Sequence, residues 1–212
     1  MTLPPPFFEY GNIDLRGMKK IMFNDRFCLT QAVLDGRKRQ ERRIIKPQPE
    51  YKEDKGLLWK GAYSDIGYFR LGEVVEIAQS YYNAKVLGDN TVDYPLIFDD
   101  GDTGYRNKMF VKSALMPHQI KITNVRVERL QDISDEDCIA EGVRMVESSN
   151  NWGNSATHTE YNFSYYDKRG NQQLIRGLKP QETYSYLIDK INGQGTWERN
   201  PWVWVYDFEL VR

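Results

Sequence analysis

The chain has 212 residues, of which 40% are hydrophobic and 28% are charged, so it can build either one large domain or two small ones around a real core. The charges nearly cancel, with 29 Lys and Arg against 30 Asp and Glu, so any cationic surface has to be local. No apolar run reaches membrane-spanning length, so we expect neither a helical membrane protein nor a membrane partner.

Cysteines and histidines are sparse and scattered. Cys28 and Cys138 lie far apart without a Cys-x-x-Cys spacing, so we expect no disulfide scaffold and a cytoplasmic setting. His118 and His158 are isolated, so we expect no zinc site, no other metal and no cofactor. The N-terminal residues Met1–Phe8 lack the charged start and long apolar segment of a secretory signal.

The first predicted elements are a strand at Lys20–Phe23 and a helix at Asp25–Leu34. Asn24 is a good N-cap for this helix and Gly36 a good terminator. The segment Gly36–Arg43 then places five cations and one carboxylate in eight residues. Such a cluster predicts an anion site, for nucleic-acid phosphate or a nucleotide, or else a solvated helix end that complements the helix dipole. The candidate phosphate-binding residues are Arg37, Lys38, Arg39, Arg42, Arg43 and Lys46.

Three strands are expected beyond the basic segment. Gly72–Tyr81 contains a β-branched run, and Ile120–Glu128 alternates but switches its apolar parity between Ile122 and Val125, which predicts a β-bulge. The C-terminal strand alternates most clearly. We expect its even-numbered face to form the core of a barrel, through Trp202, Trp204, Tyr206, Phe208 and Leu210.

Two helices are predicted in the second half. Ser134–Gly142 begins with a cap residue, carries acids in its first turn and ends at glycine. Gln181–Ile191 places an apolar face toward the core before Asn192-Gly193 ends it. That face consists of Tyr184, Leu187, Ile188 and Ile191.

Two inserted segments, at about 82–118 and 144–179, are predicted to be long irregular connections, here called excursions. They lie inside a single predicted domain that spans 1–212. The second excursion carries a predicted hairpin around Asp167–Asn171. Aromatic rings in or beside the excursions could pack or could stack on RNA bases: Tyr81, Tyr82, Trp152, Tyr161, Tyr165 and Tyr166. The excursions are also candidate surfaces for a protein partner.

Several pieces, taken in order, resemble the ASCH domain, a branch of the PUA-like superfamily, and particularly its longer phage- and prophage-borne members. The matching pieces are Asp35–Lys38, Arg42–Pro47, Leu71–Val75, Ile122–Ile133, Ile139–Gly142, Ile191–Gly193 and Asn200–Val205. The resemblance implies an α+β fold: a twisted, partly closed β-barrel with flanking helices and inserted excursions. It also implies RNA or nucleotide as a partner.

Compact ASCH members include amidohydrolases of acetylated cytidine, with the motif Gly-x-Lys-x-x-Thr-x-Arg and a later Glu. Gly36, Lys38 and Arg43 match that motif, and Glu141 matches the later Glu. Glu41 replaces the nucleophilic Thr, so an acyl-enzyme at this position is not expected.

The leading hypothesis is therefore an RNA- or nucleotide-binding module with an anion-binding cleft between Gly36–Arg43 and Glu141. The alternative is a hydrolase of a modified nucleoside (an amidohydrolase) or of RNA, with Lys38, Glu41 and Glu141 as catalytic residues. A third possibility is a phage accessory protein that binds another protein through its excursions.

Overall fold

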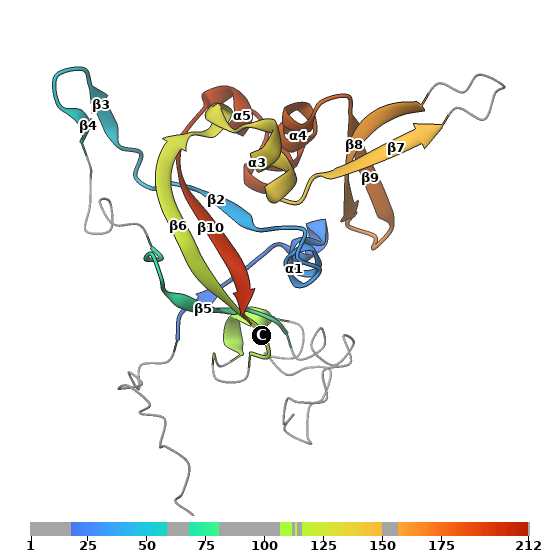
Figure 1. Ribbon diagram of the computed structural model, residues 1–212, viewed down its shortest axis with the longest axis horizontal. Helices are drawn as coiled ribbons and strands as arrows, with labels where there is room; N and C mark the ends of the chain where they lie inside the picture. Colours follow the sequence, from blue (N-terminus) through green and yellow to red (C-terminus); the bar gives the residue numbers. More distant parts are fainter. Residues whose placement is uncertain are drawn as a thin grey trace, which may run out of the picture.

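The computed structural model describes residues 18–58, 68–80, 107–111, 113, 116–149 and 157–211, which form a mixed α+β fold (Figure 1). Its strands are β1 (Lys20–Ile21), β2 (Gln40–Ile44), β3 (Glu50–Lys52), β4 (Gly56–Leu58), β5 (Val74–Ile77), β6 (Gln119–Arg129), β7 (Arg144–Ser149), β8 (Thr157–Tyr166), β9 (Gln172–Gly177) and β10 (Trp202–Val211). Its helices are α1 (Leu29–Leu34), α3 (Asp135–Ala140), α4 (Pro180–Asn192) and α5 (Thr196–Arg199), with 3-10 turns η1 (Asp25–Phe27), η2 (Lys108–Phe110) and η4 (Leu130–Asp132).

A five-stranded sheet in the order β1-β5-β6-β10-β2 is the centre of the fold. β1 runs parallel to β5, and the other neighbouring strands are antiparallel. The two longest strands, β6 and β10, bend together as one curved ribbon (Figure 1). Within the described residues β1 and β2 are the edges, and the sheet does not close into a barrel.

The predicted β-bulge in β6 is confirmed. Asn124 pairs with Asp207 and Ile122 pairs with Phe208, so Thr123 is the extra residue that absorbs the change in apolar parity. The bulge lets Ile120 and Ile122 stay fully buried while the strand continues past it.

The burial of β10 corrects the predicted core face. Tyr206 and Phe208 are buried as expected, but at the start of the strand Val203 and Val205 are fully buried and Trp202 and Trp204 only partly so. β10 is a central strand, flanked by β6 and β2, and core residues lie on both of its faces. The Trp202 ring instead lies under the guanidinium of Arg129, 4.4 Å from its centroid. A strand buried on both faces cannot be assigned one inner face from alternation alone.

The prediction that residues 144–179 form a long irregular connection is wrong. Much of it folds as a three-stranded antiparallel sheet in the order β7-β8-β9, whose Phe163 and Ile175 join the core. The hairpin at its β8–β9 turn is confirmed, with the Asp167 carboxylate accepting from the backbone N–H of Arg169 and Asn171 at 2.8 and 2.9 Å. Residues 82–106 of the first excursion lie outside the described residues.

The predicted N-terminal helix is divided in two. Cys28 adopts a left-handed conformation (φ 56°) between η1 and α1, and Asn24 caps η1 as expected by accepting from the Arg26 N–H. The sequence prediction of one continuous helix across Cys28 is therefore wrong.

The two later helices match their predictions. Ser134 caps α3 by accepting from the Asp137 N–H at 3.1 Å, and Gly142, with φ of 106°, follows the end of the helix. α4 buries Tyr184, Leu187 and Ile188. No helix in the described part of the chain is long and apolar enough to cross a lipid bilayer.

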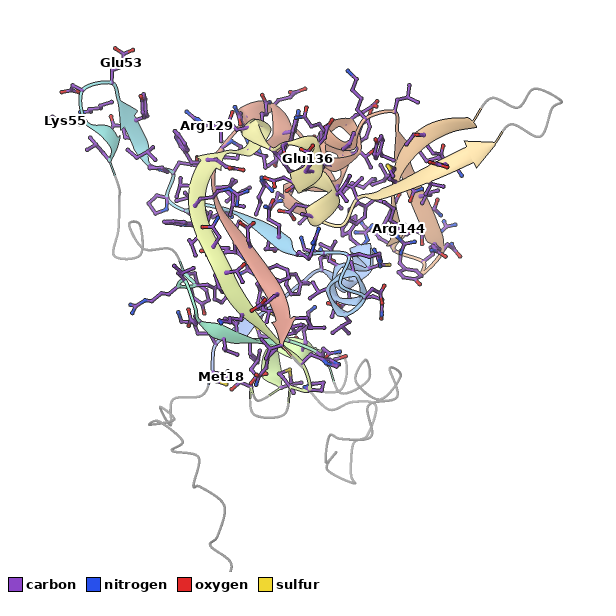
Figure 2. All side chains as sticks on the ribbon, in the orientation of Figure 1. Met18, Glu53, Lys55, Arg129, Glu136 and Arg144 are labelled. Atoms are coloured by element: carbon purple, nitrogen blue, oxygen red, sulfur yellow. The ribbon has the colours of Figure 1, made fainter. Side chains whose placement is uncertain are left out.

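The β3–β4 hairpin stands apart from the main sheet, and Glu53 and Lys55 at its tip point away from the rest of the molecule (Figure 2). Near its base, the Tyr51 ring lies 6.3 Å from that of Trp202. The hairpin is thus remote from the region where the predicted site residues meet, described next.

Candidate functional site

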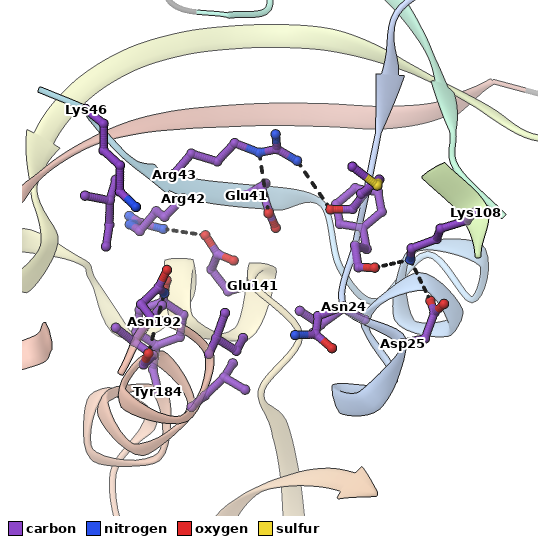
Figure 3. Close-up of a pocket in the computed structure, with 17 residues that line it drawn as sticks. Asn24, Asp25, Glu41, Arg42, Arg43, Lys46, Lys108, Glu141, Tyr184 and Asn192 are labelled. Carbon is purple, nitrogen blue, oxygen red and sulfur yellow. Dashed lines mark hydrogen bonds and ion pairs between the residues drawn. The ribbon is translucent and has the colours of Figure 1, made fainter. Parts of the chain in front are cut away.

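A cavity of about 620 Å³ opens between β2, the segment around η1 and α4 (Figure 3). Its size falls within the usual range of small-molecule sites, about 300–1,000 Å³. The α4 wall is mainly aliphatic, through Leu187, Ile188 and Ile191, and also carries Tyr184 and Asn192. The opposite wall is β2, with Glu41 and Arg43, so an apolar surface faces a charged one.

Lys38, Glu41 and Glu141 converge beside this cavity, as the sequence interpretation required. The Lys38 ammonium lies 2.5 Å from Oε2 of Glu141 and 3.0 Å from Oε2 of Glu41. It also donates to the backbone carbonyl of Gln40 at 2.6 Å. The Lys38 residue is only 1% exposed and Glu141 only 3% exposed, while Glu41 is partly exposed. Both carboxylates line the cavity, whereas Lys38 is held behind them.

Local backbone structure explains this convergence. The loop after α1 turns back onto its own helix, where the Lys38 N–H donates to the Ala32 carbonyl at 2.9 Å. The next residue, Arg39, donates its N–H to the Ala140 carbonyl at 2.7 Å, which joins the loop to the end of α3. Glu141 is the C-cap of that helix, so the same junction brings its side chain to Lys38.

The ionisation of the pair follows from burial and charge. Burial alone would lower the pKa of Lys38, but the negative charges of Glu141 and Glu41 outweigh it and raise that pKa, so the amine is an ammonium. Burial raises the pKa of the Glu141 carboxyl above its ordinary value, against the opposing charges of Lys38 and Arg42. A carboxylate with raised proton affinity at a cavity wall is suited to accept a proton from a bound molecule.

Arg42 is an interior residue that holds the carboxylates in place. Its side chain is fully buried, with Nη1 lying 3.3 Å from Oε1 of Glu141 and Nη2 lying 2.7 Å from Oδ2 of Asp137. Glu128 and Gln40 also accept from its guanidinium. Although burial opposes the charge, Glu141, Tyr184, Asp137 and Glu128 raise the pKa of Arg42, which is a permanent cation. Because its partners are all internal, Arg42 positions Glu141 and is not a surface phosphate ligand.

The six cations of the basic segment therefore do not form one surface. Lys38 and Arg42 are buried in ion pairs. Arg37, paired with Asp35 at 2.8 Å, and Arg39 line a separate hollow of about 630 Å³. Arg42, Arg43 and Lys46 line the α4 cavity, but the Arg42 side chain is 0% exposed and is held in internal ion pairs, which leaves Arg43 and Lys46 as the accessible two.

Arg43 spans the top of the cavity in Figure 3, above Glu41. Its Nη2 donates to the Met22 carbonyl at 3.3 Å, and its guanidinium lies 5.3 Å from the centroid of the Phe69 ring. Its side chain remains about a third exposed, at 32%. Arg43 is thus anchored at the cavity but still accessible to a bound anion.

Lys108 and Tyr184 are among the polar residues of this cavity that the sequence did not indicate as site residues, as are Asn24, Asp25 and Asn192. Lys108 comes from a distant segment and donates to the Phe23 carbonyl and, at 3.0 Å, to Oδ1 of Asp25. Tyr184 was predicted only as part of an apolar helix face, yet its hydroxyl makes no hydrogen bond within the described part of the chain and its side chain lines the cavity. Nothing in the sequence around Lys108 indicates its position, whereas a tyrosine on a core-facing helix stripe always carries a polar group that needs a partner.

The aromatic residues proposed for base stacking lie elsewhere. The Tyr165 ring stacks on Phe27 at 5.6 Å and lies under the ammonium of Lys190, so it is packing within the fold. Tyr161 is also partly buried, and Tyr166 is 43% exposed. None of these three lines the α4 cavity. Tyr81, Tyr82 and Trp152 lie outside the described residues.

Comparison with known proteins gives no relative: no protein-family model, no curated protein and no solved structure matches the chain. Over the described ranges, no group of three or more His, Cys, Asp or Glu side chains is arranged to hold a metal ion. The arrangement of the site's own residues is therefore what indicates its chemistry.

Proposed function

We propose that the α4 cavity binds a nucleotide, either free or as part of an RNA strand, on an ASCH-type, PUA-like fold. The curved β6–β10 ribbon with β5 and β2 alongside, and α1, α3 and α4 around it, is compatible with that fold. The observation that carries the functional proposal is the cavity itself, which pairs an aliphatic wall with a cationic rim.

The two walls suit the two halves of a nucleotide. Leu187, Ile188 and Ile191 give the cavity an apolar side for a base, and burying the base there is favourable. Arg43 and Lys46 lie across from that surface and can hold phosphate oxygens, Arg43 through a planar fork of donors. Lys108 is already shared between Asp25 and a carbonyl, so it contributes less to a bound anion.

The experiment is a set of titrations with nucleoside monophosphates and short single-stranded RNA and DNA, at low and high salt. We expect binding that weakens as salt rises, because phosphate contacts release counterions. Arg43→Ala should weaken binding of every sequence alike, and Arg39→Ala is the matched control because Arg39 lies outside the cavity. Absence of salt-sensitive binding to all of these ligands would refute the proposal.

A second function, hydrolysis, is favoured by the Lys38–Glu41–Glu141 cluster. Glu141 or Glu41 would take a proton from water, the water oxygen would bond to an acyl carbon, and the C–N bond would break as the amine leaves with that proton. Lys38 does not line the cavity, so it would act by positioning the two carboxylates. In RNA cleavage the same base would take the proton of a ribose 2′-hydroxyl, whose oxygen would bond to the adjacent phosphorus while the P–O5′ bond breaks and the 5′-oxygen leaves with that proton.

Incubation with N4-acetylcytidine and with labelled RNA tests this second function. Turnover that Glu141→Gln abolishes while nucleotide binding persists would support hydrolysis, because the amide cannot act as a base. Lack of product from both substrates would reject hydrolysis for these two classes and leave the binding function.

A further inference from the structure

Tyr184 places an unpartnered phenol in the wall of the α4 cavity. The residue is 1% exposed, and its hydroxyl oxygen makes no hydrogen bond with any residue that the structure describes. It lines the same cavity as Glu141, Glu41 and Arg43. A buried hydroxyl without a partner costs free energy, so a bound molecule that supplies one gains affinity.

Another buried tyrosine, Tyr206, has a hydrogen-bond partner for its hydroxyl within the fold. Tyr206 is fully buried in the core, and its hydroxyl accepts from the backbone N–H of Tyr68 at 3.0 Å. The difference between the two tyrosines is that Tyr184 lines the α4 cavity and Tyr206 does not. Its partner is thus expected to come from outside the chain.

The Glu141 carboxylate and the Asn192 amide, which line the same cavity as Tyr184, are already engaged, whereas Nε of Arg42 is buried without a partner among the described residues. Oε2 of Glu141 accepts from Lys38 and Oε1 faces Arg42, while Asn192 turns its amide onto the carbonyl of Ile188 in its own helix at 3.5 Å. Burial, together with the negative charge of Glu141, raises the pKa of the Tyr184 phenol well above 10, so the hydroxyl keeps its proton and can donate it. Among the described residues, the site thus offers a neutral donor that is bonded to no internal acceptor.

We propose that the Tyr184 hydroxyl donates a hydrogen bond to a keto oxygen on the base of the bound nucleotide, an inference that rests on the proposed function. Tyr184 lies on the α4 side of the cavity, across from Arg43 and Lys46, so it meets the uncharged half of a ligand whose phosphate is at those cations (Figure 3). Uracil, cytosine and guanine carry a keto oxygen, and adenine does not. Tyr184 is therefore a specificity-determining residue that favours keto bases over adenine.

The test compares the wild-type protein with Tyr184→Phe in titrations with the 5′-monophosphates of uridine, cytidine, guanosine and adenosine. We expect Tyr184→Phe to weaken binding of at least one keto nucleotide about three- to tenfold, the usual contribution of one hydrogen bond, and to leave the adenosine affinity unchanged. Thermal unfolding of the ligand-free variant should show a melting temperature no lower than wild type, because no internal bond is lost. Tyr206→Phe is the matched control, which should lower the melting temperature and leave binding unchanged.

Each other outcome overturns the inference in a distinguishable way. Equal affinities of wild type and Tyr184→Phe for all four nucleotides would reject the role of the hydroxyl and leave nucleotide binding standing. A wild-type protein that binds none of the four would reject the proposed function and this inference with it. A drop in melting temperature for Tyr184→Phe as large as that for Tyr206→Phe would show that the hydroxyl has an internal partner.

Discussion

The Lys38 ammonium lies 2.5 Å from a carboxylate oxygen of Glu141, although 103 positions separate the two residues in the chain. The contact joins the loop after α1 to the C-cap of α3, and both charges are almost completely removed from water. Ions in such surroundings are tolerated only while each has its partner. The pair is therefore expected to matter for folding as well as for the site.

The first prediction concerns the energetic coupling of this pair. Lys38→Met should lower the free energy of unfolding by about 3–5 kcal/mol, because it leaves the buried Glu141 charge without its closest cation. Combining it with Glu141→Gln should cost less than the sum of the two single changes, since the double variant contains neither charge. Urea unfolding of the wild type, both single variants and the double variant measures the coupling. Strictly additive losses would contradict the buried pair.

The second prediction separates two adjacent arginines. Arg42→Met should cost about 3–5 kcal/mol of unfolding free energy, because Glu141, Asp137 and Glu128 lose a shared buried cation. Arg43→Ala should cost only about 1 kcal/mol or less, since its ion pair with Glu41 is long, at 3.7 Å, and partly exposed.

For ligand binding we expect the opposite order: Arg43→Ala should lower the affinity more than Arg42→Met does. Arg43→Ala should weaken nucleotide binding and reduce its salt dependence, because Arg43 is, with Lys46, an accessible cation of the cavity. Chemical denaturation and titration of both variants check the two rankings. If Arg42→Met were as stable as Arg43→Ala, the interior position of Arg42 would be wrong.

The contrast between Arg42 and Arg43 could not be predicted from the sequence. The basic segment looked like one cationic surface because a charged residue is usually exposed, and nothing local tells Arg42 from Arg43. Burial of Arg42 depends on acids that lie 86 to 99 positions away, at Glu128, Asp137 and Glu141. Only the folded chain brings those acids to it. The convergence of Lys38 with Glu141 was expected only from a resemblance to a family motif, not from spacing.

Features set by neighbouring residues were easier to predict. The bulge in β6 followed from a one-residue change of parity, and the start of α3 from the cap residue Ser134. The three-stranded sheet was missed because its strands are rich in Ser, Asn, Gln and Tyr, and few side chains reach the core. Such strands are held by backbone pairing and by isolated anchors such as Phe163, so their sequences resemble those of loops.

The third prediction concerns the reactivity of the two cysteines. Burial raises the pKa of the Cys138 thiol to about 12, and the residue is fully buried. At pH 8 only roughly one molecule in ten thousand would carry its thiolate, against about a quarter for an unfolded cysteine with a pKa near 8.5. In a Cys28→Ser variant, a thiol-specific chromogenic reagent should therefore react slowly in buffer and at once in denaturant. Rapid labelling of the native variant would contradict the interior position of Cys138.

The fourth prediction is a loss of stability in acid that depends on Asp137. Burial raises the pKa of this carboxyl, but hydrogen bonds and charge from Arg42, the Gln40 amide and the Arg126 guanidinium outweigh burial and lower it below 3.8. A carboxyl whose pKa is lower in the folded than in the unfolded state binds fewer protons when folded. Its stabilisation is present above the unfolded pKa, near 4, and is lost as the pH falls through the folded pKa.

Unfolding free energies measured in urea from pH 7 down to pH 3 check this linkage. Asp137→Asn should be less stable than wild type at pH 7, because Arg42 and Arg126 lose a shared acceptor charge, and the difference should shrink below pH 4 as the wild-type carboxyl becomes protonated. Glu209→Gln, at an exposed position of β10, is the control and should follow the wild-type curve. A stability gap between Asp137→Asn and wild type that stays constant from pH 7 to pH 3 would show that the Asp137 charge does not stabilise the fold.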